Sequence, residues 1–342
     1  MPAEWGKHEA VWLAWPHDKI SFPPLHLAKV ETVYAQIIKA LSDSELVNLL
    51  VLNKKMKAEV FKMLEKNNLD SSKIIFHITD YADVWLRDYG PMFVMNSKKK
   101  KLSWVKWQYD AYSKKFPMLL KDNQVFYDLK NKVSGEMLES TMVLEGGSIE
   151  QNGCGTILTT KQCLLNSGRN PGLARAQIES NLKKNLGGTN IIWLEKGLLN
   201  DHTDGHIDDI ARFVSPDTIV CAYEEDKSQK NHQILKNNFE NLEKALDQDG
   251  KPFKVIKLQV PHLTYDQNKP FEAGNQAPAS YTNFYIGNKV VLVPTYNDLN
   301  DEQALEKIQS YFPDRKVVGI DCVDLIYGGG AVHCITQQQP AR

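Results

Sequence analysis

Apolar residues follow two patterns that alternate along this chain: helical spacing in some segments and short continuous runs in others. Val30, Val33, Ile37 and Leu41 are three or four positions apart, the spacing of a helix that buries one face. Residues 46–52 follow as a short apolar run, which is typical of a buried strand. The same patterns predict helices at residues 54–67, 173–186, 229–247 and 301–312, and strands at residues 74–78, 190–194, 218–223, 253–260, 281–286, 289–294 and 316–322.

The alternation of helices and strands indicates an α/β protein. No linker rich in proline, glycine or serine divides the 342 residues, so we expect one domain over residues 1–342. The 41 basic and 42 acidic residues nearly cancel, which predicts neither nucleic acid nor a membrane surface as a partner. We expect the one basic run, at residues 98–101, to be a solvated hairpin tip.

The five cysteines are scattered, and no two of them form a C-x-x-C pair. This distribution argues against a disulfide framework and against a cysteine-rich zinc site. The N-terminus lacks the apolar stretch of a signal peptide, and no run approaches the roughly 18 apolar residues of a membrane span. We therefore expect a cytoplasmic protein, in which Cys154, Cys163, Cys221 and Cys322 only pack.

The remaining cysteine, Cys334, lies between the glycines at 329–330 and a polar run at 336–339. Flexible backbone before a thiol and hydrogen-bonding groups after it suit a nucleophile, which needs access and support for the thiolate. The alternative is a small buried residue, because free cysteine is often buried. The rest of the chain must decide between these interpretations.

Two further segments bring a carboxylate to a glycine turn. Asp88 precedes the turn at residues 90–91, and Glu145 follows an apolar run and precedes Gly146 and Gly147. Either carboxylate alone is more typical of a turn or cap than of a catalytic site.

A third segment joins histidines and carboxylates. If residues 206–210 form a strand, His206 and Asp208 point to the same face and make a usable acid/base pair. His202 and His206 have the spacing of metal ligands on a helix, but the intervening residues 203–205 are poor helix formers. The glutamate of the H-E-x-x-H zinc motif is also missing.

Convergence of Cys334, His206, Asp88, Asp208 and Glu145 would favour one chemistry. Several carboxylates near a thiol oppose its ionisation, unless a bound cation offsets their charge. Planar guanidinium suits such a site, because carboxylates bind it through paired hydrogen bonds. The thiolate would attack the central carbon, the histidine would protonate the departing ammonia, and water would then release a ureido product. This charge pattern favours guanidine hydrolysis over acyl transfer.

These motifs together resemble the agmatine deiminase family, which belongs with the bacterial peptidylarginine deiminases in the guanidino-group-modifying superfamily. The resemblance runs nearly end to end and keeps the order of the motifs. They lie at residues 1–5, 15–16, 85–91, 145–148, 205–209, 280–285 and 329–340.

The resemblance implies a five-fold pseudosymmetric α/β propeller of ββαβ modules around a central active site. It also implies that the enzyme uses no metal and no organic cofactor. The resemblance implies that Cys334 is the nucleophile and that His206 is the acid/base. It implies that Asp88 and Asp208 bind the guanidinium and that Glu145 orients the histidine. It also implies that Trp85 forms the pocket wall beside the alkyl chain and that Asn283 lies at the site entrance.

The implied reaction converts agmatine and water to N-carbamoylputrescine and ammonia, a step of putrescine biosynthesis. Residues 107–113 offer no arginine that would bind a substrate carboxylate, which favours agmatine over free or peptidyl arginine. This stretch, with Tyr112, departs from the family's usual Phe-Asn-x-Trp-Gly pattern, and His202 stands where many relatives have an acid.

Four alternatives stay open. They are a peptidylarginine or arginine deiminase, an amidinotransferase with the same covalent intermediate, a non-catalytic guanidine or polyamine binder, and a zinc hydrolase that uses His202, His206 and Asp208. A homodimer is an assembly that we also consider.

Overall fold

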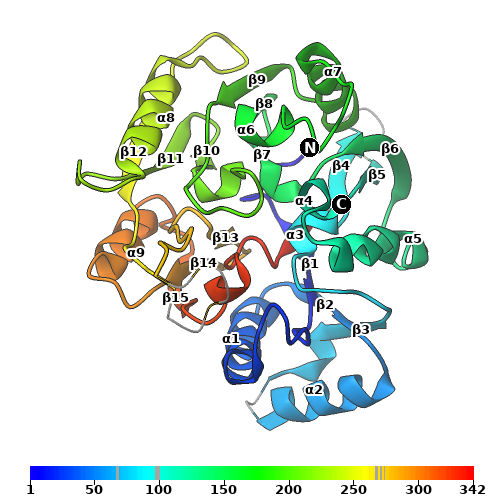
Figure 1. Cartoon of the computed structure of the whole chain (residues 1–342). Coiled ribbons are helices and arrows are strands. Elements are labelled where there is room, and N and C mark those ends of the chain that lie inside the picture. The colour runs from blue at the N-terminus through cyan, green and yellow to red at the C-terminus, as the bar shows by residue number, and fades with distance from the viewer. Residues whose placement is uncertain (67–68, 97–100, 266–268, 270–271, 273) are drawn as a thin grey trace.

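Five small sheets surround one centre in the computed structural model (Figure 1). It describes all residues except 67–68, 97–100, 266–268, 270–271 and 273, so the expected hairpin tip at residues 98–101 lies outside the described residues but for Lys101. Four of the sheets have three strands and one has four.

Each sheet repeats one plan, in which the first two strands are antiparallel and the third is parallel to the second. The strands of the second and third sheets are β4 (Met92–Asn96), β5 (Lys101–Gln108), β6 (Glu136–Val143), β7 (Ile149–Gln151), β8 (Thr156–Thr160) and β9 (Asn190–Leu194). Those of the fourth and fifth are β10 (Ala211–Ser215), β11 (Thr218–Tyr223), β12 (Lys254–Gln259), β13 (Tyr285–Ile286), β14 (Val290–Thr295) and β15 (Lys316–Asp321).

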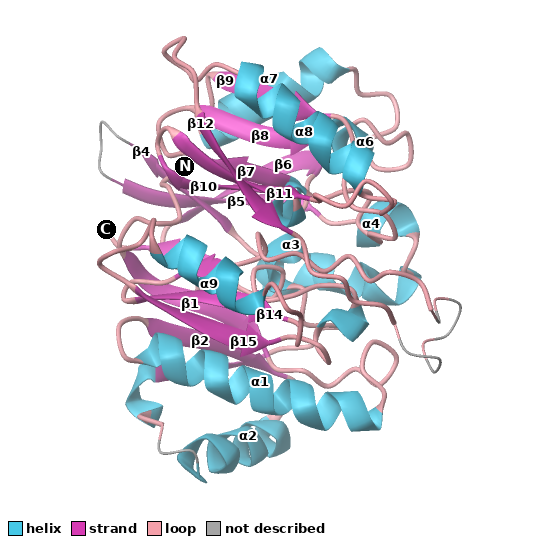
Figure 2. Ribbon diagram, turned by 90° about the vertical axis from the view of Figure 1, so that its left-hand side faces the viewer, coloured by secondary structure: helices cyan, strands magenta, loops and turns pink. Residues whose placement is uncertain are grey.

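Helices connect the parallel strands, because a parallel pair needs a crossover. The longer helices lie on the outside of the sheets (Figures 1 and 2). They are α1 (Pro24–Ser42), α2 (Lys54–Lys66), α7 (Arg175–Leu186), α8 (His232–Lys244) and α9 (Asp301–Gln309). Four helices are single turns: α3 (Leu86–Tyr89), α4 (Ala111–Lys114), α5 (Val125–Asp128) and α6 (Lys161–Leu164).

The two ends of the chain close the first sheet. Its order is β16–β1–β2–β3, with β16 (Gln337–Pro340), β1 (His8–Ala14), β2 (Leu46–Val51) and β3 (Ile74–Ile78). The last strand, β16, is antiparallel to β1, so that Val11 pairs with Gln338. This strand takes the place that the first strand has in the other four modules. The two chain ends lie on the same face of the molecule, with N marked near β7 and β8 and C near β4 (Figures 1 and 2).

The predicted five-module propeller is confirmed, and so is most of the predicted order of elements. Helix α1 buries the predicted face of Val30, Val33, Ile37 and Leu41. Among the described residues, no helix is both long enough and apolar enough to span a membrane.

One strand prediction, at residues 281–286, is wrong, and the strand considered at residues 206–210 does not form. Residues 206–210 contain a 3-10 turn, Ile207–Asp209, ahead of β10. Residues 281–286 form a strand only at Tyr285–Ile286. In both segments buried polar side chains form tertiary hydrogen bonds, as Thr282 Oγ1 does when it donates to the backbone oxygen of Asp208 at 3.1 Å. Such tertiary bonds satisfy polar groups in place of a regular strand ladder.

Candidate active site

Turns and short helices at the ends of the strands carry the five catalytic candidates of the sequence to the centre. Asp88 lies in α3, Glu145 follows β6, and Cys334 precedes β16. His206 and Asp208 come from the turn before β10. All five side chains are buried, which is unusual for charged groups and requires specific partners for each of them.

Gly147 shows how closely three of these groups approach each other. A Cβ atom added at this glycine would lie 2.6 Å from His206 Nδ1, 2.9 Å from Asp208 Oδ2 and 3.0 Å from Asp88 Oδ1. Any side chain here would therefore collide with all three groups. The glycine turn after Glu145 leaves the space on which the three groups converge.

A cavity of about 450 Å³ reaches this centre from the surface. Cys334 and Asp88 lie at its inner end, and Trp85 lines it, as the sequence predicts for this tryptophan. Its other lining residues are Asp18, Ile20, Ser21, Pro23, Tyr112, Phe116, Met118, Leu119, His202, Thr203, Lys269, Glu272, Tyr327, Gly328, Gly329 and Gly330.

The Cys334 thiol lies among hydrogen-bonding and acidic groups. Asn283 Nδ2 donates to Sγ at 3.1 Å, and Asp208 Oδ2 is 3.9 Å from Sγ. Burial raises the pKa of Cys334 well above its usual range, and the charges of Asp208, Asp209 and Asp88 raise it further. With no cation present, this group is therefore a neutral thiol.

Asn283 is not at the site entrance, where we expected it. Its side chain is fully buried behind the thiol. Its Oδ1 accepts a hydrogen bond from the backbone N–H of His333 at 2.9 Å, and its Nδ2 donates to Asp209 at 2.9 Å. Asn283 therefore holds the turn that carries Cys334.

Asp88 accepts hydrogen bonds from two uncharged donors. Tyr112 Oη donates to Oδ2 at 2.8 Å, and the backbone N–H of Gly147 donates to Oδ1 at 3.0 Å. Burial raises the pKa of Asp88 to about 6, against the opposing charge of His206 and with a further contribution from Asp208. This carboxylate is therefore ionised only above about pH 6.

Asp208 has a charged partner instead. Its Oδ2 lies 2.8 Å from Nδ1 of His333. Burial acts to raise the pKa of Asp208, but the hydrogen bond and the charge of His333 outweigh burial and hold the pKa below its usual value. Among the described residues, Oδ1 of Asp208 is buried without a hydrogen-bond partner. One oxygen of an ionised carboxylate is thus open to a ligand.

His206 is surrounded by groups that favour its charged form. Its Nδ1 is 3.7 Å from Asp88 Oδ1. Burial acts to lower the pKa of His206, but Asp88, Cys163 and Glu145 together raise it well above its usual value. A histidine in this state can donate a proton at neutral pH.

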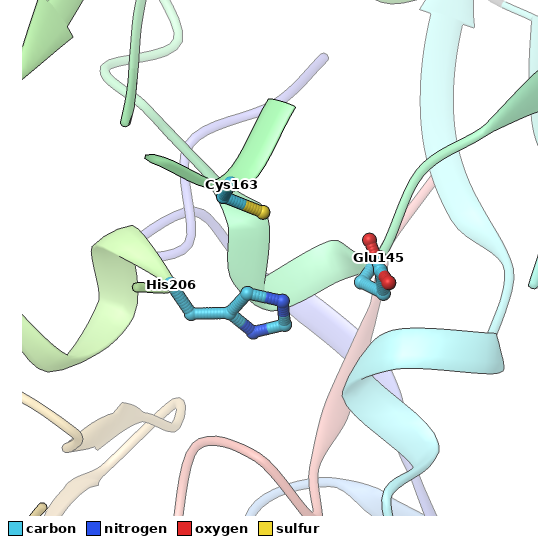
Figure 3. Close-up of side chains that lie close together, drawn as sticks. All are labelled: Glu145, Cys163 and His206. Carbon is cyan, nitrogen blue, oxygen red and sulfur yellow. The ribbon is translucent and has the colours of Figure 1, made fainter. Parts of the chain in front are cut away.

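Glu145 lies beside His206 but binds an arginine. Both carboxylate oxygens are 2.9 Å from Nε of Arg169, and both side chains are fully buried. Figure 3 shows Glu145 and Cys163 on the sides of the His206 ring, and single ligand atoms of the three residues lie within 4.8 Å of one another. Cys163, for which we expected packing alone, therefore also contacts the site.

Two clusters could in principle hold a metal ion. Glu145, Cys163 and His206 form one, and Asp208, Asp209 and Cys334 form the other. In the first, Arg169 already binds both oxygens of the carboxylate, so a metal ion would meet a fixed positive charge.

The zinc site that we considered at His202, His206 and Asp208 does not form among the described residues. His202 lines the cavity wall, and its Nε2 contacts Glu272. His206 and Asp208 are fully buried at the centre, and no helix joins the two histidines.

Sequence reasoning missed three residues that contact the candidates. Arg169 binds Glu145, Tyr112 binds Asp88, and His333 binds Asp208. Only His333 gave a usable signal, since it is a titratable residue directly before the proposed nucleophile. Arg169 and Tyr112 lie in polar loop segments where pattern alone does not distinguish them from surface residues.

The chain matches known proteins along its whole length. A sequence profile of the Porphyromonas-type peptidyl-arginine deiminases covers residues 1–340. A candidate agmatine deiminase of Legionella pneumophila (strain Paris) is 36% identical over 341 residues, which are 99% of this chain and 95% of that protein.

Solved structures of agmatine deiminases also match this chain along nearly its whole length. The agmatine deiminase of Enterococcus faecalis has a TM-score of 0.90 and 33% identity, with 99% of this chain and 95% of that chain covered. A Cys-to-Ser agmatine deiminase of C. jejuni with substrate bound has a TM-score of 0.86 and 31% identity, with the same coverage.

The sequence and structure matches thus cover nearly the whole length of this chain and of these relatives. The family resemblance predicted from the motifs is confirmed. The chain belongs to the Porphyromonas-type peptidyl-arginine deiminase family, together with the agmatine deiminases that it resembles.

Proposed function

We propose that this protein is an agmatine deiminase, which hydrolyses the guanidinium of agmatine to N-carbamoylputrescine and ammonia within a single catalytic domain. One observation carries the proposal: the buried thiol of Cys334 faces two aspartates, and Asp208 offers an unpaired oxygen. A buried carboxylate oxygen without a donor is costly unless a ligand supplies one. Guanidinium supplies several donors in one plane.

Substrate charge and nucleophile charge are coupled in this site. A guanidinium between Asp88 and Asp208 offsets the two charges that keep the pKa of Cys334 high. The thiol then releases its proton to solvent water, and the thiolate adds to the central guanidinium carbon. His206 donates a proton to the departing nitrogen, ammonia leaves, and an amidino group remains on the sulfur.

The second half of the reaction reverses the role of His206. Having lost its proton, the imidazole accepts one from water, and the resulting hydroxide adds to the amidino carbon. The carbon–sulfur bond breaks, the ureido product leaves, and the sulfur is regenerated. We propose Cys334 as nucleophile, His206 as acid and base, and Asp88 with Asp208 as the guanidinium pair. Glu145 and Arg169 fix the wall beside the imidazole.

The outer cavity favours a substrate with a positive far end. Trp85, Phe116 and Met118 offer apolar surface for a methylene chain. Beyond the catalytic centre, the described lining contains the acids Asp18 and Glu272. It also contains Lys269, 3.5 Å from Glu272, and His202, whose Nε2 contacts Glu272, so Asp18 is the acid without a basic partner in this lining. An ammonium group suits these acids better than the carboxylate of arginine does.

Ammonia release from agmatine, free arginine and a peptidylarginine, measured in parallel, tests the proposal. We expect release from agmatine to exceed that from either arginine compound, and we expect none from the Cys334→Ala variant. Activity that requires an added amine such as ornithine would indicate amidino transfer instead. No ammonia from any guanidino compound would refute the proposal.

A further inference from the structure

A line of buried ionisable groups connects the N-terminal segment to the guanidinium site. Glu4 Oε2 lies 2.9 Å from Nε2 of His333, and Nδ1 of the same ring lies 2.8 Å from Oδ2 of Asp208. All three residues are at most 4% exposed. Glu4 precedes β1 and His333 precedes β16, so the line exists because these two strands pair.

Two hydrogen bonds, each with its own proton, join the three groups Glu4, His333 and Asp208. Both ring nitrogens of His333 face a carboxylate oxygen, and an ionised carboxylate can only accept. Each contact therefore needs its own proton. The pKa of Glu4 and the pKa of Asp208 are both below their usual values, in each case against burial and because of neighbouring positive charge that includes His333. Both carboxylates are therefore acceptors for the His333 ring.

Glu4 is itself fixed from several directions. Its Oε1 accepts from the backbone N–H of Ile286 at 2.9 Å and lies 3.0 Å from Nη2 of Arg212. Arg212 is held in turn by Glu150, whose Oε2 accepts from Nε at 2.9 Å. Glu4 cannot turn away from His333 without breaking these bonds.

His333 is fixed on its backbone side as well. Its N–H donates to Oδ1 of Asn283, the residue whose amide also contacts the Cys334 thiol. Among the described residues, neither Glu4 nor His333 lines the catalytic cavity, and both reach it only through Asp208 and Asn283.

We propose that Glu4 and His333 are positioning residues that hold Asp208 through its Oδ2, so that Oδ1 is directed to the guanidinium. The inference rests on the proposed function, since it assigns Asp208 to the substrate cation. The proposed role differs from a purely structural role in one measurable respect. Replacing either Glu4 or His333 should change how substrate binding depends on pH.

Two replacements of His333 separate its two contacts. In His333→Asn the amide nitrogen falls near the position of Nδ1 and can still donate to Asp208, whereas in His333→Gln it falls near Nε2 and reaches only Glu4. Loss of a hydrogen bond to a charged group predicts a fall in kcat/KM of about 10- to 100-fold for the glutamine variant. We expect a smaller fall for the asparagine variant.

Both variants lose the imidazolium charge, so the pKa of Asp208 should rise. The acidic limb of the kcat/KM profile should therefore move to higher pH in both. Calorimetric titration of agmatine into the same variants on a Cys334→Ala background should show the same order of weakening, because the role concerns binding and not the chemical step.

Glu4→Gln tests the far end of the line, and Glu45→Gln is its matched control. Glu45 is also a buried carboxylate beside a buried histidine, with its Oε2 at 3.2 Å from Nδ1 of His8. We expect Glu4→Gln to shift the acidic limb upward and to lower kcat/KM. We expect Glu45→Gln to keep the wild-type profile.

Wild-type pH profiles in folded His333→Gln and Glu4→Gln variants would overturn the inference, as would failure of all three site variants to fold while Glu45→Gln folds. The second result would assign the line to stability alone. An inactive wild-type enzyme would instead contradict the proposed function, so the two failures are distinguishable.

Discussion

Asp88 and Asp208 both lie beside Gly147 at the centre of the ring, yet their pKa values move in opposite directions. Asp88 receives its hydrogen bonds from a tyrosine hydroxyl and a backbone amide, and its pKa rises to about 6. Asp208 is paired with the His333 imidazole, and its pKa falls. Burial acts in the same direction on both carboxylates. Both carboxylates have a histidine nearby, but His206 lies 3.7 Å from Asp88, whereas His333 is hydrogen-bonded to Asp208 at 2.8 Å. The comparison teaches that a hydrogen-bonded charged partner offsets the burial of a carboxylate here, whereas a more distant charge with neutral donors does not.

Because of this difference, Asp208 and Asp88 contribute to cation binding in different ways. Asp208 is ionised before the substrate arrives, so it can attract the guanidinium. Asp88 is close to its titration point at neutral pH, and the arriving cation favours its ionised form. A site with two permanently charged aspartates would repel the thiolate more strongly in the empty state.

Removing the thiol should have the largest effect, because turnover requires the bond that the thiolate forms with the guanidinium carbon. We expect Cys334→Ala to have no measurable turnover while it still binds agmatine and unfolds at a temperature close to that of the wild type. Ammonia assays, calorimetry and thermal denaturation check the three parts. Residual turnover would assign the nucleophile elsewhere. A matched control, Cys221→Ala, replaces a buried cysteine of β11 and should stay active.

Replacing each aspartate by asparagine tests the comparison directly. Loss of a buried charge partner predicts a decrease of about 2–5 kcal/mol in transition-state stabilisation for both variants. We expect Asp208→Asn to lose more at pH 7, since its carboxylate is ionised in the empty site. Values of kcat/KM at pH 7 measure the difference. Equal losses with a change in KM alone would place both residues outside contact with the reacting group.

The stability of the same two variants should change in opposite directions. The raised pKa of Asp88 means that its ionised form destabilises the folded protein, by a penalty that is absent below about pH 4 and complete above about pH 6. Asp88→Asn should therefore raise Tm at pH 7.

The lowered pKa of Asp208 means that its ionised form stabilises the folded protein at neutral pH. This contribution is lost only as the pH falls through the folded-state pKa, which lies below the usual value. Asp208→Asn should therefore lower Tm at pH 7. Thermal denaturation without substrate checks both signs, and equal signs for the two variants would contradict the comparison.

The smallest expected effect concerns Tyr112. In the wild type, kcat/KM should fall as the pH falls through about 6, because Asp88 becomes protonated. The Tyr112 hydroxyl donates to this carboxylate and so lowers its pKa. Tyr112→Phe should move the acidic limb to higher pH, with less than about a tenfold loss at pH 8.

Tyr109→Phe is the control for this measurement. Tyr109 is a buried neighbour whose ring centroid is 5.5 Å from that of Tyr112. In the described part of the chain its hydroxyl makes no hydrogen bond to Asp88. A shift of equal size in both variants would show that packing of the two rings, and not the hydroxyl of Tyr112, sets the acidic limb.

The sequence by itself determined most of the order of helices and strands, since apolar periodicity reports which face of each element is buried. It also identified Cys334, His206, Asp88, Asp208 and Glu145 as candidates, because charge or a thiol beside glycine turns is unusual in a core. A periodic pattern carries no information where a segment is stabilised by tertiary hydrogen bonds, which is why residues 281–286 were predicted as a strand over their whole length.

The tertiary structure alone decided the partner of each candidate. Glu145 binds Arg169, Asp88 binds Tyr112, and the His333 that binds Asp208 is 125 positions away in the chain. It also decided that β16 pairs with β1 and so brings Glu4 to the centre. A pKa depends on the nearest charges in space, and spatial neighbours from different modules become known only when the ring of modules is closed.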